Sequence, residues 1–419
     1  MTKQLKIYDL TVNYKENPIG LDSPPEFSWK YTSSKRGACQ ESYKITVKSG
    51  DVETIIKANS PESLHISFKG GTLKRRTKYI WNVEIADNMG DHAISDSAYF
   101  ETGKRDEGWA ANWITADFIR KPDLAMEAPY FRKTFYLDDK PADAKLYICG
   151  LGYCRAFING EKCGDDELST AFTRYDSTAL YMTYDVTDSM SVGDNVLATV
   201  LGNGWYNCFA EDPWNTRQAT WRSSPKLIAE LHVKFADGSQ KIIYSDSSWK
   251  SSKGPITYNG IRNGEFYDAR LEIPGWNNTE YDDSKWGDVR VVRPPGGNLK
   301  SFEMQPIRRV MEFKPIKKWQ TPDGSWVFDT GQNASGVARI KVSGKAGTEV
   351  TIRYSDILEE DGVSVNTRAI GGFIKTGEFQ TDKYIKKSNE TEEWSPVFVY
   401  HGFQYIELRG LIMSLNLML

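Results

Sequence analysis

The sequence has few of the residues that usually carry catalysis or cross-links. Among its 419 residues are four histidines, which are scattered and lack a ligand spacing such as HExxH. Its five cysteines are odd in number and include no CxxC pair, which argues against a disulfide framework or a structural zinc site. No serine stands in a GxSxG elbow, and no glycine-rich loop leads from a strand into a helix. The sequence therefore gives no sign of zinc, serine-hydrolase or phosphate-loop chemistry.

The chain also lacks an excess of charge and a long apolar run. Lys and Arg number 53 against 56 Asp and Glu, for a net charge of −3, so the basic face typical of a nucleic-acid binder is not expected. No window approaches the roughly 20 apolar residues of a membrane span, and the N-terminus has no apolar run of signal-peptide length. We therefore expect a cytoplasmic protein with neither a nucleic-acid nor a membrane partner. The triplet Asn277-Asn278-Thr279 matches a glycosylation sequon, but without a secretory context we treat it as a chance match.

Helical periodicity is a third absence, because no long stretch repeats apolar residues every three to four positions. Short runs of alternating apolar and polar residues stand in its place, separated by glycine, proline, asparagine and aspartate. Aromatic residues make up 13% of the chain, a level that suits β-strands and also suits sugar binding. These patterns predict an all-β protein of three consecutive β-sandwich or jelly-roll domains.

The first predicted domain, residues 1–104, reads as a fibronectin type III- or immunoglobulin-like sandwich. Short strands such as Ser42–Lys48 and Lys78–Ile85 alternate there with turn residues. Its tryptophans are interpreted as core residues. A polar, charged stretch at Gly103–Gly108 predicts a linker to the next domain.

Residues 105–300 are predicted to form a jelly roll. Apolar runs recur along this segment, and turns in which the backbone needs positive φ separate them at Asn159-Gly160, Asp237-Gly238 and Asn263-Gly264. The run Pro294–Gly297, two prolines and two glycines, breaks both helix and strand and ends the domain.

A third β-domain is predicted over residues 301–411. Its last strand, Phe398–Leu408, alternates apolar and polar positions as a half-buried strand does. Residues 412–419 are apolar and differ abruptly from that alternation, so we treat them as an atypical tail.

Several strings in a fixed order carry a resemblance to a known family. Leu201–Tyr206, which ends in Gly-Trp-Tyr, is followed by Asn263–Arg270, by Phe328–Asn333 and by His401-Gly402-Phe403. With shorter strings between them they span the chain from about residue 24 to residue 410. In this order they resemble the N-terminal β-domains of bacterial α-L-rhamnosidases of glycoside hydrolase family 78. The third domain is similar to the concanavalin-like domain of that family.

The resemblance implies a catalytic domain that this sequence does not contain. Members of the family resemble one another in hydrolysing terminal α-L-rhamnosides with inversion, through two carboxylates in an (α/α)6 barrel that follows the His401-Gly402-Phe403 strand. Here nine residues follow Gly410. The carboxylate clusters that are present, Asp165–Glu167, Asp282-Asp283 and Glu359–Asp361, lie in polar turns, so no catalytic residue is predicted. We expect the N-terminal region of a glycosidase, itself inactive, and whether the chain is an enzyme stays open.

Sugar binding is the function that the resemblance leaves to these domains. In some family members the second domain is similar to a carbohydrate-binding module that holds rhamnose through calcium, an ion that oxygen ligands suit. Asn159 and Asn207 fit the amide positions of that pattern, whereas Ile158 stands where the pattern has an acid. No cofactor is required on this reading, and calcium at Asn159 and Asn207 is an optional one. The other sugar-binding candidates are Asn203, Trp205, Asp212 and Trp214.

Two alternatives stay open beside an inactive rhamnosidase region. One is a free-standing protein that binds a rhamnose-containing oligosaccharide or glycoside. The other is a scaffold for a separately encoded catalytic barrel. In either case the face of residues 306–410 that would meet a barrel is expected to be apolar, and contiguous apolar surface promotes self-association or docking. The loop at residues 207–216, which carries most of the sugar-binding candidates, is open to a simpler interpretation as an ordinary jelly-roll loop.

Overall fold

Two compact units make up the structure, a computed structural model that describes residues 5–119, 127–410 and 412–418. The first unit runs to Trp109 and also takes in Tyr181–Tyr184 and Leu299–Gln305, and the second contains the remaining residues. Nearly all of the regular structure in the described ranges is β-strand, and α1 (Arg368–Gly371) is a single helical turn. The all-β prediction is confirmed. No helix in these ranges has the length and apolar character needed to span a membrane.

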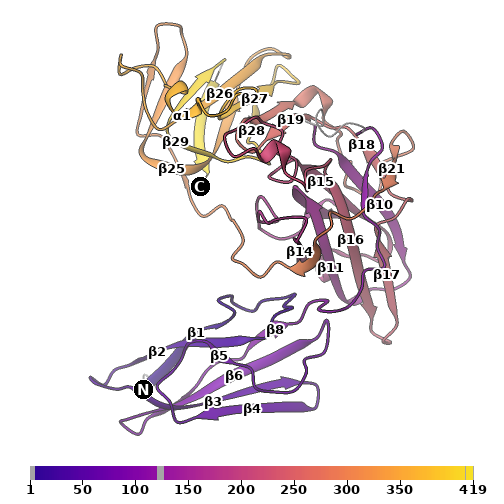
Figure 1. Ribbon diagram of the computed structural model, residues 1–419, viewed down its shortest axis with the longest axis vertical. Helices are drawn as coiled ribbons and strands as arrows, with labels where there is room; N and C mark the ends of the chain where they lie inside the picture. The colour runs from indigo at the N-terminus through magenta and orange to yellow at the C-terminus, as the bar shows by residue number, and fades with distance from the viewer. Residues whose placement is uncertain (1–4, 120–126, 411, 419) are drawn as a thin grey trace. The chain divides into compact units, whose positions relative to one another are not determined.

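The first unit consists of two antiparallel sheets around an aromatic core (Figure 1). Three strands pair in the order β1-β2-β5, and the larger sheet has the order β4-β3-β6-β7 with β8 beside β6. The bounds are β1 (Leu5–Val12), β2 (Glu26–Ser33), β3 (Gln40–Ser49), β4 (Val52–Ala58), β5 (Ile66–Ser67), β6 (Lys78–Asp87), β7 (His92–Ile94) and β8 (Ala98–Glu101). In β6 the alternate residues Trp81, Val83 and Ile85 are buried, as the period of a strand requires. The Trp81 ring lies 4.7 Å from that of Phe27, so this tryptophan is part of the core.

A single carboxylate, that of Asp22, ties three distant segments into the first unit. It accepts hydrogen bonds from the Tyr181 hydroxyl (2.8 Å), from the backbone N–H of Arg105 (2.6 Å) and from that of Ser301 (3.1 Å). Lys104 is buried beside these contacts, with its Nζ 4.8 Å from the centroid of the Trp109 ring. The stretch predicted as a linker therefore belongs to the first unit.

The second unit contains a jelly-roll sheet with the order β13-β12-β15-β10-β18-β21-β9-β16-β11, and β17 pairs with β16. Figure 1 shows β11, β16 and β17 side by side. The bounds are β9 (Ile114–Ala116), β10 (Tyr130–Leu137), β11 (Pro141–Leu151), β12 (Tyr153–Ile158), β13 (Glu161–Lys162), β15 (Gly193–Gly202), β16 (Lys226–Phe235), β17 (Gln240–Tyr244), β18 (Lys250–Ser252) and β21 (Gly287–Val291). Two further strands of this sheet, β14 (Thr178–Asp185) and β22 (Asn298–Ser301), have residues in both units. Most residues of β11, β15 and β16 are buried on both faces, which explains their nearly continuous apolar sequences.

Short turns of 3₁₀-helix and tight hairpins connect these strands. The 3₁₀ turns are η2 (Thr187–Ser189), η3 (Thr216–Gln218) and η4 (Ala269–Leu271). At the predicted turn between β12 and β13, Asn159 has φ of 49° and Gly160 has φ of 90°. Positive φ at both central residues is the type I′ hairpin for which Asn-Gly is the strongest short signal.

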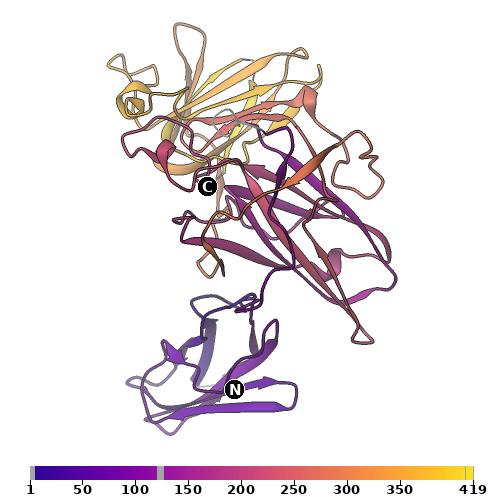
Figure 2. The ribbon, with the colours of Figure 1, turned by 45° about the vertical axis from the view of Figure 1, so that its right-hand side comes forward.

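A third sheet completes the second unit, with the order β19-β20-β27-β26-β29-β25-β30-β23 and with β24 and β28 beside β25. The bounds are β19 (Ile256–Gly260), β20 (Gly264–Asp268), β23 (Glu312–Phe313), β24 (Lys317–Gln320), β25 (Trp326–Val342), β26 (Glu349–Ser355), β27 (Thr381–Ile385), β28 (Glu392–Trp394), β29 (His401–Arg409) and β30 (Ile412–Met418). Figure 2 shows the later strands of this sheet, from β25 onward, in orange and yellow, with α1 beside them. The tail is therefore not a separate feature, because β30 pairs antiparallel with both β25 and β23.

One hairpin of the second unit crosses the predicted boundary at residue 300. The hairpin β19–β20, which we expected within the jelly roll, belongs instead to the third sheet. Its second strand runs parallel to β27, with Phe266 opposite Lys383 and Asp268 opposite Ile385. A turn signal such as Asn263-Gly264 predicts a hairpin but does not predict which sheet the hairpin joins. The pairing of β20 with β27 therefore could not be predicted from the sequence.

Gly264 makes the crossing possible. Its φ is +134°, and a Cβ atom at this position would lie 1.8 Å from the carbonyl oxygen of Thr381 on the next strand. A side chain at this position would push β20 away from β27. The glycine of the Asn-Gly-Glu string is therefore required both for the turn and for the close approach of the two backbones.

We expect Gly264→Ala to destabilise the protein by more than about 3 kcal/mol, because both the backbone conformation and the contact with Thr381 oppose a Cβ. Gly238→Ala is the matched control, since Gly238 also has positive φ (+86°) but has no atom within 4 Å of the added Cβ. It should lose only about 1–2 kcal/mol, the price of the left-handed conformation alone. Urea unfolding of both variants measures the difference, and equal losses would contradict the steric role of Gly264.

Candidate functional site

A network of buried polar residues, Asp382, Tyr354, His401 and Glu265, holds the hairpin β19–β20 to the rest of the third sheet. The Asp382 carboxylate accepts hydrogen bonds from the Tyr354 hydroxyl (2.8 Å) and from the backbone N–H of Glu265 (2.8 Å). Nε2 of His401 lies 3.0 Å from the same carboxylate, and the His401 ring stacks on that of Tyr354 at 4.1 Å. Because buried polar groups are costly unless they are hydrogen-bonded, this network favours one arrangement of β20, β26, β27 and β29.

Glu265 extends the network to the strand that leads into β29. Its carboxylate accepts hydrogen bonds from the backbone N–H groups of Val397 (3.0 Å) and Phe398 (2.9 Å). Burial, and to a lesser extent the nearby Asp382 carboxylate, raise the pKa of Glu265 to about 8, even though both N–H groups favour the charged form. Glu265 is fully buried, so it acts as a positioning residue for residues 396–400.

A continuous row of aromatic rings lies on the surface near this network. We call Phe373, Trp214, Trp205 and Phe172, together with the Arg262 guanidinium between the two tryptophans, the aromatic row. Phe373 lies 5.4 Å from Trp214, and Trp205 lies 5.6 Å from Phe172. Arg262 lies 4.3 Å from the Trp214 centroid and 5.0 Å from that of Trp205. Trp214 is 61% exposed and Phe172 is 52% exposed, so two rings of the row face solvent.

Hydrogen bonds and ion pairing fix the position of Trp214 in the row. Asp212 accepts from the backbone N–H groups of Trp214 (2.9 Å) and Thr216 (3.3 Å), and it pairs with Arg262 at 2.5 Å. Arg262 sits at the tip of the hairpin β19–β20, and each of its contacts with an indole contributes about 0.5–2 kcal/mol. An exposed ring that is held in this way loses little conformational freedom when a ligand stacks on it.

Segments from both sheets of the second unit meet along the row. The loop that carries Trp214 is bound to the loop after α1, because Glu211 N–H donates to Thr376 Oγ1 (3.1 Å) and Lys375 N–H donates to the Glu211 carbonyl (3.0 Å). Asn263 donates from its side chain to the carbonyls of Thr376 (2.7 Å) and Glu378 (2.9 Å). The row is therefore attached to the tip of the hairpin β19–β20, which the buried network fixes, and to the loop between α1 and β27.

A pocket of about 370 Å³ opens at the Phe172 and Trp205 end of the row. Its volume falls in the range of roughly 300–1,000 Å³ that is usual for small-ligand sites. The pocket is mostly apolar and has three charged residues on its wall. The lining residues are Tyr153, Glu167, Leu168, Ala171, Phe172, Trp205, Ile307, Arg308, Arg309, Ser335, Gly336, Val337, Pro396, Val397, Val399 and Tyr400.

The charged side of the pocket is centred on Glu167. Arg155 pairs with this carboxylate, Arg309 Nε lies 3.3 Å from it and Lys162 Nζ lies 3.4 Å from it. Burial raises the pKa of Glu167, but Arg155 and then Lys162 and Arg309 bring it below its ordinary value, so Glu167 is ionised at neutral pH. The wall at residues 396–400, which Glu265 positions, closes the pocket on another side.

Comparison with known proteins identifies this architecture. Three family descriptions match in order: "Rha78A-like, N-terminal immunoglobulin domain" over residues 7–106, "Alpha-L-rhamnosidase N-terminal domain" over 139–311 and "Bacterial alpha-L-rhamnosidase concanavalin-like domain" over 319–417. The chain belongs to the bacterial α-L-rhamnosidase family. The predicted resemblance is thereby confirmed, and the match is to the N-terminal β-domains.

Individual relatives agree with this assignment. An α-L-rhamnosidase of Formosa agariphila is 34% identical over 96% of this chain, and the chain spans 45% of that protein. The solved structure of the α-L-rhamnosidase from Dictyoglumus thermophilum is 35% identical, with a TM-score of 0.87, and the match covers 99% of this chain and 48% of the other. The α-L-rhamnosidase of Streptomyces avermitilis complexed with L-rhamnose matches over 99% of this chain and 57% of its own with a TM-score of 0.87, but at 23% identity it shows the fold alone. The chain thus spans about half the length of the relatives it matches.

The structure places the predicted sugar-binding candidates in three separate positions. Trp205, Asp212 and Trp214 come together at the aromatic row. Asn203 and Asn207 are buried beneath, where Asn207 donates to Asn203 Oδ1 (2.8 Å) and Asn203 donates to the carbonyl of Asn259 (2.9 Å). These two asparagines shape the turn below the row, and their burial keeps them from a ligand on its surface.

Asn159 lies away from the other candidates, so the predicted calcium pair does not fit the structure. Its amide donates to the Ser189 carbonyl (2.9 Å) and to Asn195 Oδ1 (2.8 Å), and its oxygen accepts from the Val196 N–H (2.9 Å). Val196 is near the start of β15 and Asn207 follows its end, a separation of roughly 20 Å along the strand. One calcium ion cannot be bound by both asparagines. Among the described residues, no group of three His, Cys, Asp or Glu could hold a metal ion.

Sequence reasoning missed Arg262, Phe172, Phe373 and the cationic wall of the pocket. Each of these residues is brought in by a segment far from the Gly-Trp-Tyr string that drew attention to the loop. The one available signal was that the Asn263-Gly264 turn places Arg262 at a hairpin tip, where a long side chain reaches a neighbouring loop.

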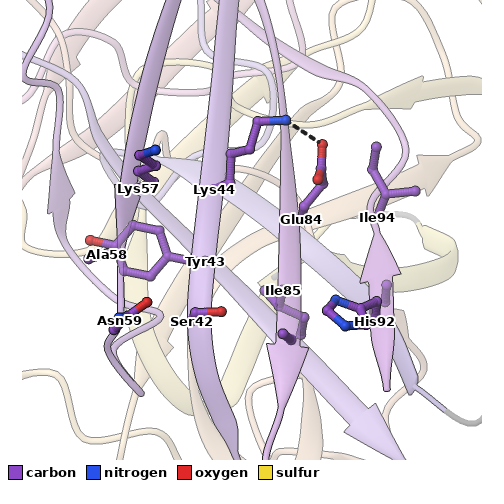
Figure 3. A pocket seen from close by; sticks show the side chains of 12 residues that line it. Ser42, Tyr43, Lys44, Lys57, Ala58, Asn59, Glu84, Ile85, His92 and Ile94 are labelled. Atoms are coloured by element: carbon purple, nitrogen blue, oxygen red, sulfur yellow. Dashed lines mark hydrogen bonds and ion pairs between the residues drawn. The ribbon is translucent and has the colours of Figure 1, made fainter. Parts of the chain in front are cut away.

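A second concavity, of about 900 Å³, lies on the first unit but offers less to a sugar (Figure 3). It covers the larger sheet, from Lys57 on β4 to Ile94 on β7, and Lys44 pairs with Glu84 across its centre at 3.0 Å. Of the residues that line it, Tyr43 is the only Trp, Tyr or Phe, and it is buried. It provides no ring for stacking, so the aromatic row is the better candidate.

The raised pKa of Glu265 predicts a loss of stability as the pH rises. A carboxyl with a folded-state pKa of about 8 binds its proton more tightly in the folded state than in the unfolded one, where the value is near 4.5. Its contribution is therefore complete below about pH 4.5 and is lost as the pH rises toward 8 and above. The melting temperature of the protein should fall over this range.

Glu265→Gln provides the test of that assignment. The variant should be less stable at every pH, because its amide NH2 meets a backbone N–H donor, but its melting temperature should fall less between pH 5 and 8. Glu167→Gln is a control. The pKa of the Glu167 carboxyl lies below its usual range, so this group does not titrate between pH 5 and 8. Parallel pH profiles for the wild type and Glu265→Gln would show that Glu265 does not titrate in this window.

Proposed function

We propose that this chain serves an α-L-rhamnosidase as a carbohydrate-binding part, and that the aromatic row and its pocket hold a rhamnose-containing oligosaccharide. The observation that supports this most directly is the row itself. Sugar rings present one face of C–H groups and a rim of hydroxyls, and flat aromatic rings with nearby polar side chains suit both. Trp214, Trp205 and Phe172 provide the rings, and Arg262, Glu167 and Arg309 provide hydrogen-bonding groups beside them.

The spacing of the row favours an oligosaccharide over a single sugar. The pocket has room for one sugar residue at the Phe172 end, and the row continues from there through Arg262 to Phe373. An oligosaccharide could therefore place one sugar in the pocket and stack the following sugars on the exposed rings of the aromatic row. Relatives that are named α-L-rhamnosidases support rhamnose as one of these sugars.

Hydrolysis is not part of the proposal for these residues. An inverting glycosidase needs two carboxyls on either side of an accessible bond, roughly 6.5–9.5 Å apart. The carboxyls of Glu265 and Asp382 are close together, but both are fully buried and neither lines the pocket. Glu167 lines the pocket, but three neighbouring cations lower its pKa. It is therefore ionised at neutral pH and carries no proton to donate as a general acid.

Trp214→Ala should weaken binding of a rhamnose-containing disaccharide by about tenfold, equivalent to about 1.4 kcal/mol, because it removes the most exposed ring of the row. Isothermal titration calorimetry measures the affinity, and Tyr136→Ala is the control, since Tyr136 is exposed on the same unit but lies on β10. A chromogenic aryl α-L-rhamnoside should bind without release of its aryl group. Absence of heat with every rhamnoside would refute the proposal.

A second candidate function, docking through residues 307–316, rests on exposed apolar side chains. Val310 is 81% exposed and Ile316 is 64% exposed, and Ile307 and Met311 are also exposed on this segment. We propose that this face, part of the predicted surface at 306–410, pairs with a second copy of the chain when nothing else covers it. A separately encoded barrel domain would use the same face.

Sedimentation velocity tests the second candidate. The wild type should associate at roughly 100 μM, within the range in which exposed apolar surface drives association, and Val310→Ser combined with Ile316→Ser should be more monomeric. Val291→Ser is the control, because Val291 is exposed on β21. A wild-type chain that stays monomeric at that concentration would argue against self-association.

A further inference from the structure

Three side chains of the first unit form a hydrogen-bonded series on its surface. The Tyr14 hydroxyl lies 2.9 Å from Nε2 of His65, and Nδ1 of the same ring lies 3.0 Å from the Glu26 carboxylate. Tyr14 is 68% exposed, and the side chains of His65 and Glu26 are each 45% exposed. A hydroxyl, an imidazole and a carboxylate in this order are the arrangement in which a general base activates a nucleophile.

The smaller sheet, β1-β2-β5, brings these residues together at one end (Figure 1). Glu26 begins β2, His65 directly precedes β5, and Tyr14 lies in the turn that follows β1. The His65 N–H donates to Ser28 Oγ (3.1 Å), and Ser28 is on the same face of β2 as Glu26. Phe27, between them, points the other way into the core. The three side chains therefore meet outside the core, where solvent reaches them.

The backbone at Tyr14 has a conformation that bulky residues rarely adopt. Val12 and Lys15 exchange two backbone hydrogen bonds (2.9 and 3.0 Å). The two residues between them, Asn13 and Tyr14, have φ of 50° and 64°. Positive φ at both positions is the type I′ turn, which favours glycine where Tyr14 stands. His65 also has positive φ, of 56°. Residues held in this region against their preference are typical of functional sites.

Hydrogen bonds from neighbouring segments fix the turn that carries Tyr14. Asn13 Oδ1 accepts from the Glu26 N–H (2.7 Å), and Asn13 Nδ2 donates to Ser23 Oγ (2.9 Å). Gln305 Nε2 donates to the Tyr14 carbonyl (2.6 Å). Because the backbone on both sides of the Tyr14 side chain is held, the phenol stays within reach of the imidazole.

The partners of His65 determine which of its ring nitrogens can accept a proton. An ionised carboxylate only accepts hydrogen bonds, so Nδ1, next to Glu26, carries the hydrogen of the neutral ring. Nε2 then presents its lone pair to the Tyr14 hydroxyl. His65 is thereby placed to take the Tyr14 proton as the phenol oxygen attacks an electrophile, and Glu26 stabilises the imidazolium that forms.

We propose that Tyr14 is a nucleophile that takes an acyl group from activated esters, those whose leaving group is a weaker base than a tyrosine phenolate. A bond forms between the Tyr14 oxygen and the carbonyl carbon, and the bond from that carbon to the leaving oxygen breaks. The hydroxyl proton passes to His65 Nε2 and then to the leaving oxygen, so the products are acyl-Tyr14 and the released alcohol. Glu26 is a positioning residue. This modification site lies on the first unit and does not depend on carbohydrate binding.

Treatment of the 419-residue chain with para-nitrophenyl acetate, followed by peptide mass spectrometry, tests this inference. Tyr14 should be acetylated about ten or more times faster than Tyr8 and Tyr136, because a positioned general base contributes about 10²–10⁴-fold in rate. Tyr8 is 44% exposed and Tyr136 is 53% exposed, and neither hydroxyl bonds to a histidine among the described residues. A fast phase should release about one para-nitrophenol per chain, and Tyr14→Phe should lose it.

Variants of the other two residues separate activation from simple exposure. His65→Asn should lower the Tyr14 rate to that of Tyr136, because asparagine tolerates the left-handed backbone but does not take a proton. Glu26→Gln should lower the rate by a smaller factor at an unchanged melting temperature, since its amide oxygen still accepts from Nδ1 but carries no charge. His92→Asn is the control, because His92 is exposed on β7, and it should leave the Tyr14 rate as in the wild type.

Two kinds of result would overturn the inference. Equal acetylation of Tyr14, Tyr8 and Tyr136 in the wild type is one, and a Tyr14 rate that persists in His65→Asn is the same kind, since both show that the imidazole does not activate the phenol. A fast phase that survives in Tyr14→Phe but not in His65→Asn is the other, because it makes the imidazole itself the acyl acceptor. Neither result bears on carbohydrate binding, which calorimetry measures separately.

Discussion

The parallel contact between β20 and β27 is the constraint on which the rest of the second unit depends. Gly264 allows the two backbones to approach, and Asp382 then receives donors from Glu265 and Tyr354 in a space closed to water. Glu265 in turn fixes residues 396–400, which form a wall of the pocket, and the tip of the same hairpin carries Arg262 into the aromatic row. A candidate binding surface on the outside of the molecule is thus positioned by a polar cluster inside it.

The composition and short-range patterns of the sequence predicted the class of the fold well. Alternation along β6 and the apolar runs of β11, β15 and β16 depend only on neighbouring residues, and so does the Asn159-Gly160 turn. The strings that resemble rhamnosidases identified the family for the same reason, since they are local. Pairing between segments more than a hundred residues apart leaves no local mark, so the transfer of β19–β20 to the third sheet was not predicted.

The candidate site shows the same division. Trp205, Asp212 and Trp214 were predicted together because they stand close in one loop, and the structure places them near one another. Asn159 was grouped with Asn207 by position in a motif, but β15 lies between them and carries them to opposite ends of a strand. Arg262 and Arg309 come from elsewhere in the chain, and a lone arginine in a turn or an irregular segment has no feature that distinguishes it from a solvated one. Their importance follows only from what the fold places beside them.

The crossing hairpin also bears on how the chain is made. Glu265 and Asp382, which must meet before the hairpin can dock, are 117 residues apart in the sequence. During synthesis, at about 5–20 residues per second, the ribosome therefore presents residues 256–268 for several seconds or more before their partner strand exists. During that interval the edge of β20 that later pairs with β27 has no partner strand. A chaperone that covers this edge, or a translational pause that lengthens the interval, would alter the yield of folded protein without changing any residue of the site.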